Sequence, residues 1–230
     1  MSKRYIVGAV VAALVVVGVI VGISVAGGGG DGGEVTGIEG AADARELVEG
    51  IPQQGRVLGD PDAPVTVVGY GDIACPACKT ASETSIPELI DEYVRDGRVK
   101  LEFVAIDALR TVSGERGALG VIAAEEQDAA WSLSELLYKN QGDERSEWLT
   151  DDLLEEAVAG LGLDVADWRA AYDGEGVVTR FAEYEQRAIA AEVRVTPTFV
   201  VEGPRGERTL EGAANIGAFR EAIDEVGPRT

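Results

Sequence analysis

The longest apolar stretch of the 230-residue chain lies near its N-terminus. Ile6–Ala26 is a run of 21 residues without a charged side chain. At about 1.5 Å per residue, a helix of this length spans roughly 31 Å, which matches the hydrocarbon core of a bilayer. Lys3 and Arg4 precede the run, and positive charge favours the cytoplasmic side. We therefore predict a cytoplasmic stub (1–4), a single-pass transmembrane anchor (5–26) and an extracytoplasmic remainder.

A cleaved signal peptide is the alternative interpretation of this segment. Ser24-Val25-Ala26 is an acceptable small-residue cleavage site, but the apolar run exceeds the roughly 7–15 residues usual in signal peptides. Both interpretations place the following residues across the membrane. In Gly27–Gly40, eight of 14 residues are glycine, which predicts a flexible linker. Residues 27–54 are read as this linker and a short helix at Ala41–Glu49.

Beyond a turn-rich loop at 55–64, the hydrophobic pattern predicts an α/β arrangement. Val65–Tyr70 is a short apolar, β-branched run typical of a buried strand, and Arg98–Ala105 predicts a second strand. Between them a helical stretch runs to about Arg95, and Pro87 is expected to kink or restart it.

Apolar residues at helical spacing then dominate about 113–192, where Trp and Leu residues are expected to form core. Thr150 and Asp164 suit helix N-caps in this part. Strand character returns at Thr198–Glu202, and a turn allows Glu207–Leu210 to pair back as a hairpin. Asn215 suits the cap of a last helix. The order of elements predicts one α/β domain at 55–230 with an all-helical insertion.

Composition excludes several classes of function. The chain has 20 basic and 41 acidic residues, a net charge of −21, and such a surface repels nucleic acid. The same acidity is compatible with a high-salt habitat, which composition alone does not decide. With two cysteines and no histidine, the chain builds no Ser–His–Asp or Cys–His catalytic group and no zinc site of four Cys or His ligands. We expect no nucleic-acid partner, no metal and no cofactor.

Cys75 and Cys78 carry the chemistry that the sequence predicts. The thiolate is the reactive form of cysteine, and Cys75 stands between a predicted strand and a predicted helix, where the helix dipole and free N–H groups stabilise an anion. Cys78 follows one turn later on the same side, so it can attack a mixed disulfide at Cys75. A static disulfide over so short a loop would contribute only about 2 kcal/mol. A half zinc site completed by another chain is the other alternative.

Three segments together resemble the DsbA-like thioredoxin family. They are Leu58–Val68 with Gly71–Cys78, Leu136–Gln141, and Val193–Val200. The resemblance covers about residues 55–226. It implies a thioredoxin fold with an inserted all-helical subdomain, and thiol–disulfide oxidoreductase activity with Cys75 as nucleophile and Cys78 as resolving cysteine.

The resemblance also implies that Thr196-Pro197 is the family's cis-proline loop. In the family this loop lies beside the active-site sulfurs, and its backbone pairs with the substrate strand. The residues alone equally allow a trans proline that opens an edge strand.

The sequence departs from the family at two places. Gly69 stands where many members carry an acid that helps to move the proton of the resolving cysteine. Asp72 is the candidate substitute, although a loop position favours a solvated side chain. The pair between the cysteines is Pro76-Ala77, whereas the strongest oxidants in the family have His at the second place, so a weaker oxidant is expected.

Three hypotheses of function remain at this point. The first is oxidation of dithiols in reduced, translocated proteins, with reoxidation by a membrane redox partner. The second is a reductase or isomerase that uses the same residues. The third is a tethered thioredoxin-like binding or holdase module in which the cysteines are incidental.

Overall fold

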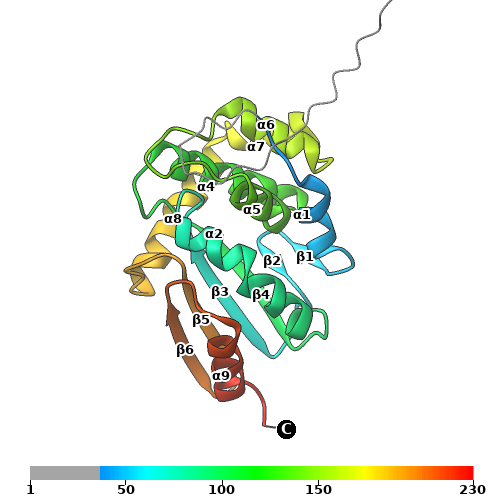
Figure 1. The fold of residues 1–230 in the computed structure, drawn as a ribbon, viewed down its shortest axis with the longest axis vertical. Coiled ribbons are helices and arrows are strands. Elements are labelled where there is room, and N and C mark those ends of the chain that lie inside the picture. Colours follow the sequence, from blue (N-terminus) through cyan, green and yellow to red (C-terminus); the bar gives the residue numbers. More distant parts are fainter. Residues whose placement is uncertain (1–36, 230) are drawn as a thin grey trace, which may run out of the picture. The chain divides into compact units, whose positions relative to one another are not determined.

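The computed structural model describes residues 37–229. The predicted stub, the predicted anchor and most of the predicted linker lie outside these residues. Within residues 37–229, no helix is both long and apolar enough to span a bilayer. The described chain folds into a mixed sheet flanked by helices (Figure 1).

The six strands of the sheet lie in the order β1-β2-β4-β3-β5-β6. They are β1 (Gln53–Gln54), β2 (Val57–Leu58), β3 (Val65–Gly71), β4 (Val99–Ala105), β5 (Thr198–Gly203) and β6 (Gly206–Glu211). Only β3 and β4 pair in parallel. Both are buried at almost every position, which explains their continuous apolar sequence. The predicted strands and the hairpin are confirmed. The two-residue strands β1 and β2 were not predicted, and β2 lies inside the predicted loop at 55–64.

The helices occupy the predicted parts of the chain. They are α1 (Ala41–Val48), α2 (Pro76–Glu83), α3 (Ser85–Leu89) with a π-helical turn (Ile90–Val94), α4 (Val112–Ala124), α5 (Ala130–Lys139), α6 (Asp151–Gly160), α7 (Val165–Tyr172), α8 (Glu175–Ala190) and α9 (Ile216–Val226). Along the sequence, helices α4 to α8 all come after β4 and before β5. Figure 1 shows α4–α7 gathered at one end of the sheet and β5, β6 and α9 at the other.

Helix starts were predictable because their caps are local. The side chains of Thr150, Asp164 and Asn215 each accept an N–H bond from the backbone three residues later. The helix after Cys75 is interrupted, as predicted, but the break falls at Thr84, and Pro87 lies in the first turn of the restarted helix α3.

A buried carboxylate ties the sheet to the elements around it. Glu102 in β4 is 9% exposed, and it accepts bonds from Arg56, beside β2, and from Arg187 of α8. Burial alone would raise the pKa of Glu102, but the two guanidinium groups hold it below its ordinary value. An ion pair buried in this way is costly to break.

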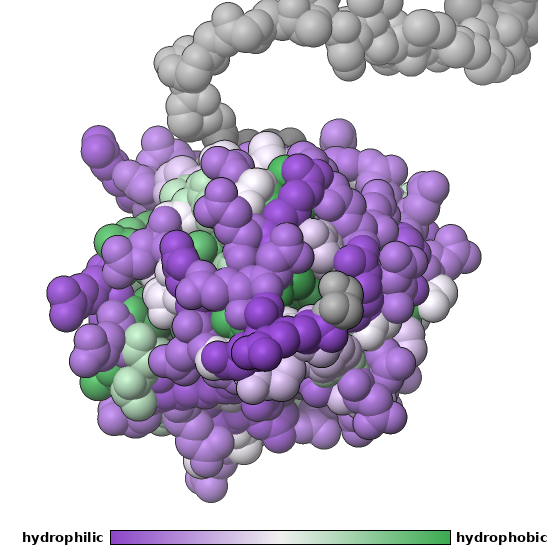
Figure 2. Space-filling view, turned by 90° about the horizontal axis from the view of Figure 1, so that it is seen from below, coloured by the Kyte–Doolittle hydropathy of each residue, from purple (hydrophilic) through white to green (hydrophobic). Residues whose placement is uncertain are grey.

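The surface is largely polar, and the face seen from below in Figure 2 is mainly hydrophilic.

The described chain enters the domain beside the C-terminal end of α5. The N–H of Glu39 donates to the Asn140 side chain at 2.8 Å, and the Asn140 amide donates back to the Glu39 carbonyl at 2.8 Å. The N–H of Ile38 also donates to Glu156 of α6, at 3.2 Å. The start of the domain is therefore fixed to the helical insertion.

Helix α4 presents three glycines at a spacing of three residues. An added Cβ at Gly114 would lie 2.8 Å from Asp72 Oδ1, one at Gly117 would lie 2.6 Å from Ile73 Cβ, and one at Gly120 would lie 2.3 Å from Leu154 Cδ2. At Gly114 and Gly117 the connector between β3 and α2 thus rests directly on the α4 backbone, and at Gly120 a side chain of α6 does.

We predict that Gly117→Ala destabilises the protein by about 1–3 kcal/mol, the usual effect of overpacking. The obstructing atom is Cβ of Ile73, which cannot move without its backbone. The matched control is Gly176→Ala in α8, where nothing lies within 4 Å of the added Cβ and helix propensity favours alanine. Denaturant titration measures both. Equal stability of the two variants would contradict the prediction.

Candidate active site

The site is built where β3 turns into α2. Asp72 is fully buried, its Oδ1 accepts the N–H of Ala74 at 2.8 Å, and its Oδ2 accepts the N–H of Leu109 at 2.9 Å. The N–H of Cys75 bonds the Asp72 carbonyl at 3.0 Å. These bonds fix a tight turn that delivers Cys75 to the N-cap of α2, with Pro76 as the first helical residue.

Cys75 is placed to ionise. Its pKa falls to about 6, chiefly because the Cys78 thiol donates a hydrogen bond to the Cys75 sulfur. Burial opposes this shift, while the Thr196 side chain and the N–H groups of Cys78 and Ala77 favour it. The N–H groups at the start of α2 thus add to the stabilisation of the thiolate that the Cys78 thiol provides. Of the predicted modulators between the cysteines, Pro76 is exposed and Ala77 is half-buried.

Cys78 has the opposite environment. It is 3% exposed, and burial raises its pKa well above the ordinary value, to which the neighbouring Cys75 adds. The backbone N–H of Asp72 bonds to it and opposes the rise. Both cysteines are free thiols in this structure. The pair therefore combines a readily ionised sulfur with one that holds its proton.

Thr196 and Pro197 meet this pair from the distant end of the chain. The Thr196–Pro197 bond is cis, as the resemblance implied. The Cys75 thiol lies 3.3 Å from the Thr196 carbonyl oxygen, and Pro197 lines the cavity that Cys78 borders. Four residues predicted from sequence, Cys75, Cys78, Thr196 and Pro197, are thus brought together.

The comparisons with known proteins agree with this geometry. A family model described as thioredoxin matches residues 52–225. The chain belongs to the thioredoxin family. It is 32% identical over 149 residues to a probable disulfide bond formation protein D of Bacillus cereus, which covers 64% of this chain and 69% of that protein.

Solved structures of the family share its architecture. Oxidised BdbD of Bacillus subtilis aligns with a TM-score of 0.66 and 25% identity, covering 76% of this chain and 95% of that one. Wolbachia pipientis alpha-DsbA1 aligns with a TM-score of 0.59 and 18% identity, covering 80% and 95%, and supports the fold alone. The chain has a thioredoxin fold with a helical insertion, and it is a DsbA-like thiol–disulfide oxidoreductase.

Asp72 differs from the solvated loop residue that the sequence favoured. It is 0% exposed, and burial raises its pKa to about 6. Because both carboxylate oxygens are engaged by backbone N–H groups, Asp72 acts on the shape of the turn that this thioredoxin-family site requires.

Sequence reasoning missed the residues that fasten the site to α5. The amide of Gln141 donates to the carbonyls of Ile73, at 2.6 Å, and Cys75, at 3.1 Å. Lys79 Nζ donates to the carbonyl of Tyr138 at 2.6 Å. The N-terminal turn of α2 is therefore bonded to the C-terminal end of α5.

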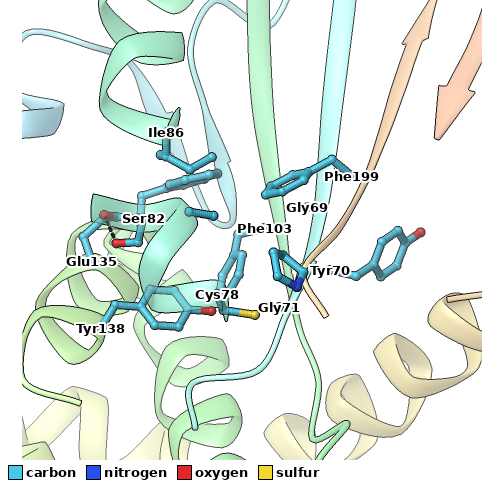
Figure 3. A pocket seen from close by; sticks show the side chains of 13 residues that line it. Gly69, Tyr70, Gly71, Cys78, Ser82, Ile86, Phe103, Glu135, Tyr138 and Phe199 are labelled. Atoms are coloured by element: carbon cyan, nitrogen blue, oxygen red, sulfur yellow. Dashed lines mark hydrogen bonds between the residues drawn. The ribbon is translucent and has the colours of Figure 1, made fainter. Parts of the chain in front are cut away.

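Glu135 was also missed, although its spacing carried a signal. It lies four residues after Trp131 and three before Tyr138, so all three share one helix face. It is 8% exposed and accepts a 2.6 Å bond from the Ser82 hydroxyl (Figure 3). Burial raises its pKa to about 7. The signal in the sequence was therefore an acidic residue on an otherwise apolar helix face, which indicates a buried carboxyl group.

We predict that Cys75 ionises near pH 6, so its rate of alkylation by iodoacetamide rises between about pH 5 and pH 7 and then levels. In a Cys78→Ala variant the midpoint moves upward toward the ordinary value of 9.0, because the main hydrogen-bond donor is lost. Mass spectrometry of the alkylated protein measures both profiles. An unchanged midpoint in the variant would contradict the prediction and assign the shift to Thr196 and the helix N-terminus.

Proposed function

We propose that this oxidoreductase introduces disulfide bonds into translocated proteins through a Cys75–Cys78 dithiol/disulfide cycle. The observation that carries the proposal is the contrast between the two sulfurs, one with a pKa of about 6 and one with a pKa well above 9.0. An ionised Cys75 is a good leaving and attacking group, whereas a buried, protonated Cys78 is kept from outside partners.

In the oxidising direction, a substrate thiolate attacks Cys75 of the disulfide, and Cys78 leaves and takes up a proton. A second substrate thiol gives up its proton and attacks the substrate sulfur of this mixed disulfide. The substrate disulfide forms, and Cys75 leaves as a thiolate. The two electrons from the substrate now rest on the Cys75–Cys78 dithiol, and an oxidant must remove them.

The oxidising direction is supported by the acidity of Cys75. A stabilised thiolate favours the reduced form of the enzyme, and about 1.4 kcal/mol per pKa unit corresponds to roughly 30 mV of potential. The name of the relative in Bacillus cereus, a probable disulfide bond formation protein, agrees with this direction.

Polypeptide substrates fit the surroundings of Cys75. Val195, next to the cis-proline loop, is 46% exposed, and Leu109 and Val112 near the turn are also exposed. Thr196 and Pro197 offer backbone for an extended substrate segment, as in the family. We propose that Thr196 makes this substrate backbone contact.

We propose that the catalytic domain is extracytoplasmic and held to the membrane by residues 5–26. The apolar run that supports the anchor has a length that matches a bilayer core. A membrane redox partner would reoxidise the dithiol, and no cofactor is required for the exchange itself.

A disulfide reductase or isomerase remains the second candidate, because it would use the same two sulfurs with the electron flow reversed. The redox potential of the purified chain, measured by thiol trapping in glutathione buffers, separates the two. A value around −120 mV supports a disulfide donor, and one around −270 mV supports a reductase.

We predict that Cys75→Ser abolishes oxidation of a reduced model substrate, because Cys78 alone cannot form the disulfide that the substrate attacks. Cys78→Ala retains Cys75 but cannot resolve a mixed disulfide, so covalent adducts accumulate on non-reducing gels. A tethered binding module would keep its holdase activity in both variants. Full turnover by Cys75→Ser would refute the proposed cycle.

A further inference from the structure

A small cavity lies against the buried side of Cys78. It has a volume of about 30 Å³ and is lined mainly by apolar side chains, with Phe103 and Phe199 among them. Its polar lining comes from Cys78, Ser82, Glu135 and Tyr138. A cavity of this size holds about one water molecule, provided that several polar partners face it.

The Tyr138 hydroxyl is without a hydrogen-bond partner among the described residues. Tyr138 is 4% exposed, and Figure 3 shows its hydroxyl directed toward Cys78 and Gly71. An added Cβ at Gly71 would lie 2.8 Å from this oxygen. A buried, unpaired phenol group costs free energy unless a water or a reacting group satisfies it.

Glu135 is shared by the linings of this cavity and of a second pocket. Glu135 and Ser82 line this cavity and also a second, open pocket of about 290 Å³ beside α1. The ionisable side chains around Glu135 are Asp43 from α1, Cys78 and Glu83 from α2, Tyr70 from β3, and Tyr138 and Lys139 from α5. Lys139 is paired with Asp43. Glu135 thus lies between a mainly apolar cavity beside Cys78 and a more polar pocket beside α1.

We propose that Glu135 exchanges a proton with Cys78 through the cavity, with Tyr138 and a cavity water as the connecting groups. The proposal deepens the thiol–disulfide activity described above and rests on it. It assigns α5 a part in handling the proton of the buried cysteine.

The step balances in both directions. When a mixed disulfide at Cys75 is resolved, the Cys78 thiol passes its proton to the Glu135 carboxylate, and the Cys78 thiolate attacks Cys75. The Cys75–Cys78 bond forms, the bond from Cys75 to the partner sulfur breaks, and the partner leaves as a thiolate. When the enzyme disulfide is opened by a substrate, protonated Glu135 returns the proton to the departing Cys78.

A purely structural role for Glu135 is the competing explanation, since its bond to Ser82 already joins α5 to α2. The two explanations differ in pH dependence. Burial gives Glu135 a pKa of about 7, so a proton acceptor becomes available as the pH rises through that value. If Glu135 only formed a structural hydrogen bond, the attack by Cys78 would not depend on pH near 7 while the attack by Cys75 stayed unchanged.

The test follows the reduced, full-length protein as it reacts with dithiobis(nitrobenzoate), which releases one coloured thiolate at each of two steps. The first release reports attack by Cys75, and the second reports resolution by Cys78. We expect Glu135→Gln to slow the second release at least about tenfold at neutral pH, a modest share of the usual effect of acid–base catalysis. We also expect loss of its rise near pH 7, with the first release unchanged.

The matched control is Glu125→Gln, because Glu125 is equally buried, at 8% exposed, and does not line the cavity. Both releases should keep the wild-type pH profiles in this variant. If Glu135→Gln does not fold, Tyr138→Phe decides the question, since a slower second release alone supports the connection and an unchanged one overturns it.

A second release that keeps its rate and pH profile in folded Glu135→Gln overturns this inference and leaves the proposed function intact. Equal slowing in Glu125→Gln also overturns it. Absence of the first release in the wild-type protein would instead refute the redox function of Cys75.

Discussion

The close contact between the active-site turn and helix α4 is the constraint on which the site depends. Gly114 and Gly117 leave room for Asp72 and Ile73 to lie directly on the α4 backbone. Once there, the Asp72 carboxylate satisfies two backbone N–H groups that a buried turn would otherwise leave unpaired. The chain can then begin α2 directly after Cys75 without exposing the turn to water. The helical insertion is therefore part of the active site's support.

The two cysteines acquire different properties from their places on one helix. Cys75, at the N-cap, faces the free N–H groups and the cis-proline loop, whereas Cys78 faces the packed interior between α2 and α5. Stabilising one anion and burying the neighbouring thiol separates their proton affinities without any metal or imidazole group. A chain without histidine can thus still polarise a dithiol, while the expectation of a weaker oxidant than relatives with histidine stays a prediction.

Local signals in the sequence predicted the elements, and distant contacts explain what was missed. Caps such as Thr150 and Asn215 act within three residues, and the cysteine pair needs only a strand followed by a helix. The bond from Ser82 to Glu135 joins residues 53 apart, and that from Gln141 to Ile73 joins residues 68 apart. No periodicity predicts such a meeting of α2 with α5. Strands β1 and β2 were missed because a strand of two residues is too short to show alternation. The burial of Asp72 was missed because it depends on glycines in helix α4, which is distant in the sequence.

The reciprocal bonds between Glu39 and Asn140 have a mechanical consequence. Tension on the chain that enters the domain is borne by these two bonds at the end of α5, together with the bond from Ile38 to Glu156 of α6. The next residue, Gln141, holds the carbonyls of Ile73 and Cys75. Load at this entry point would therefore reach the backbone of Ile73 and Cys75 through the residue next to Asn140.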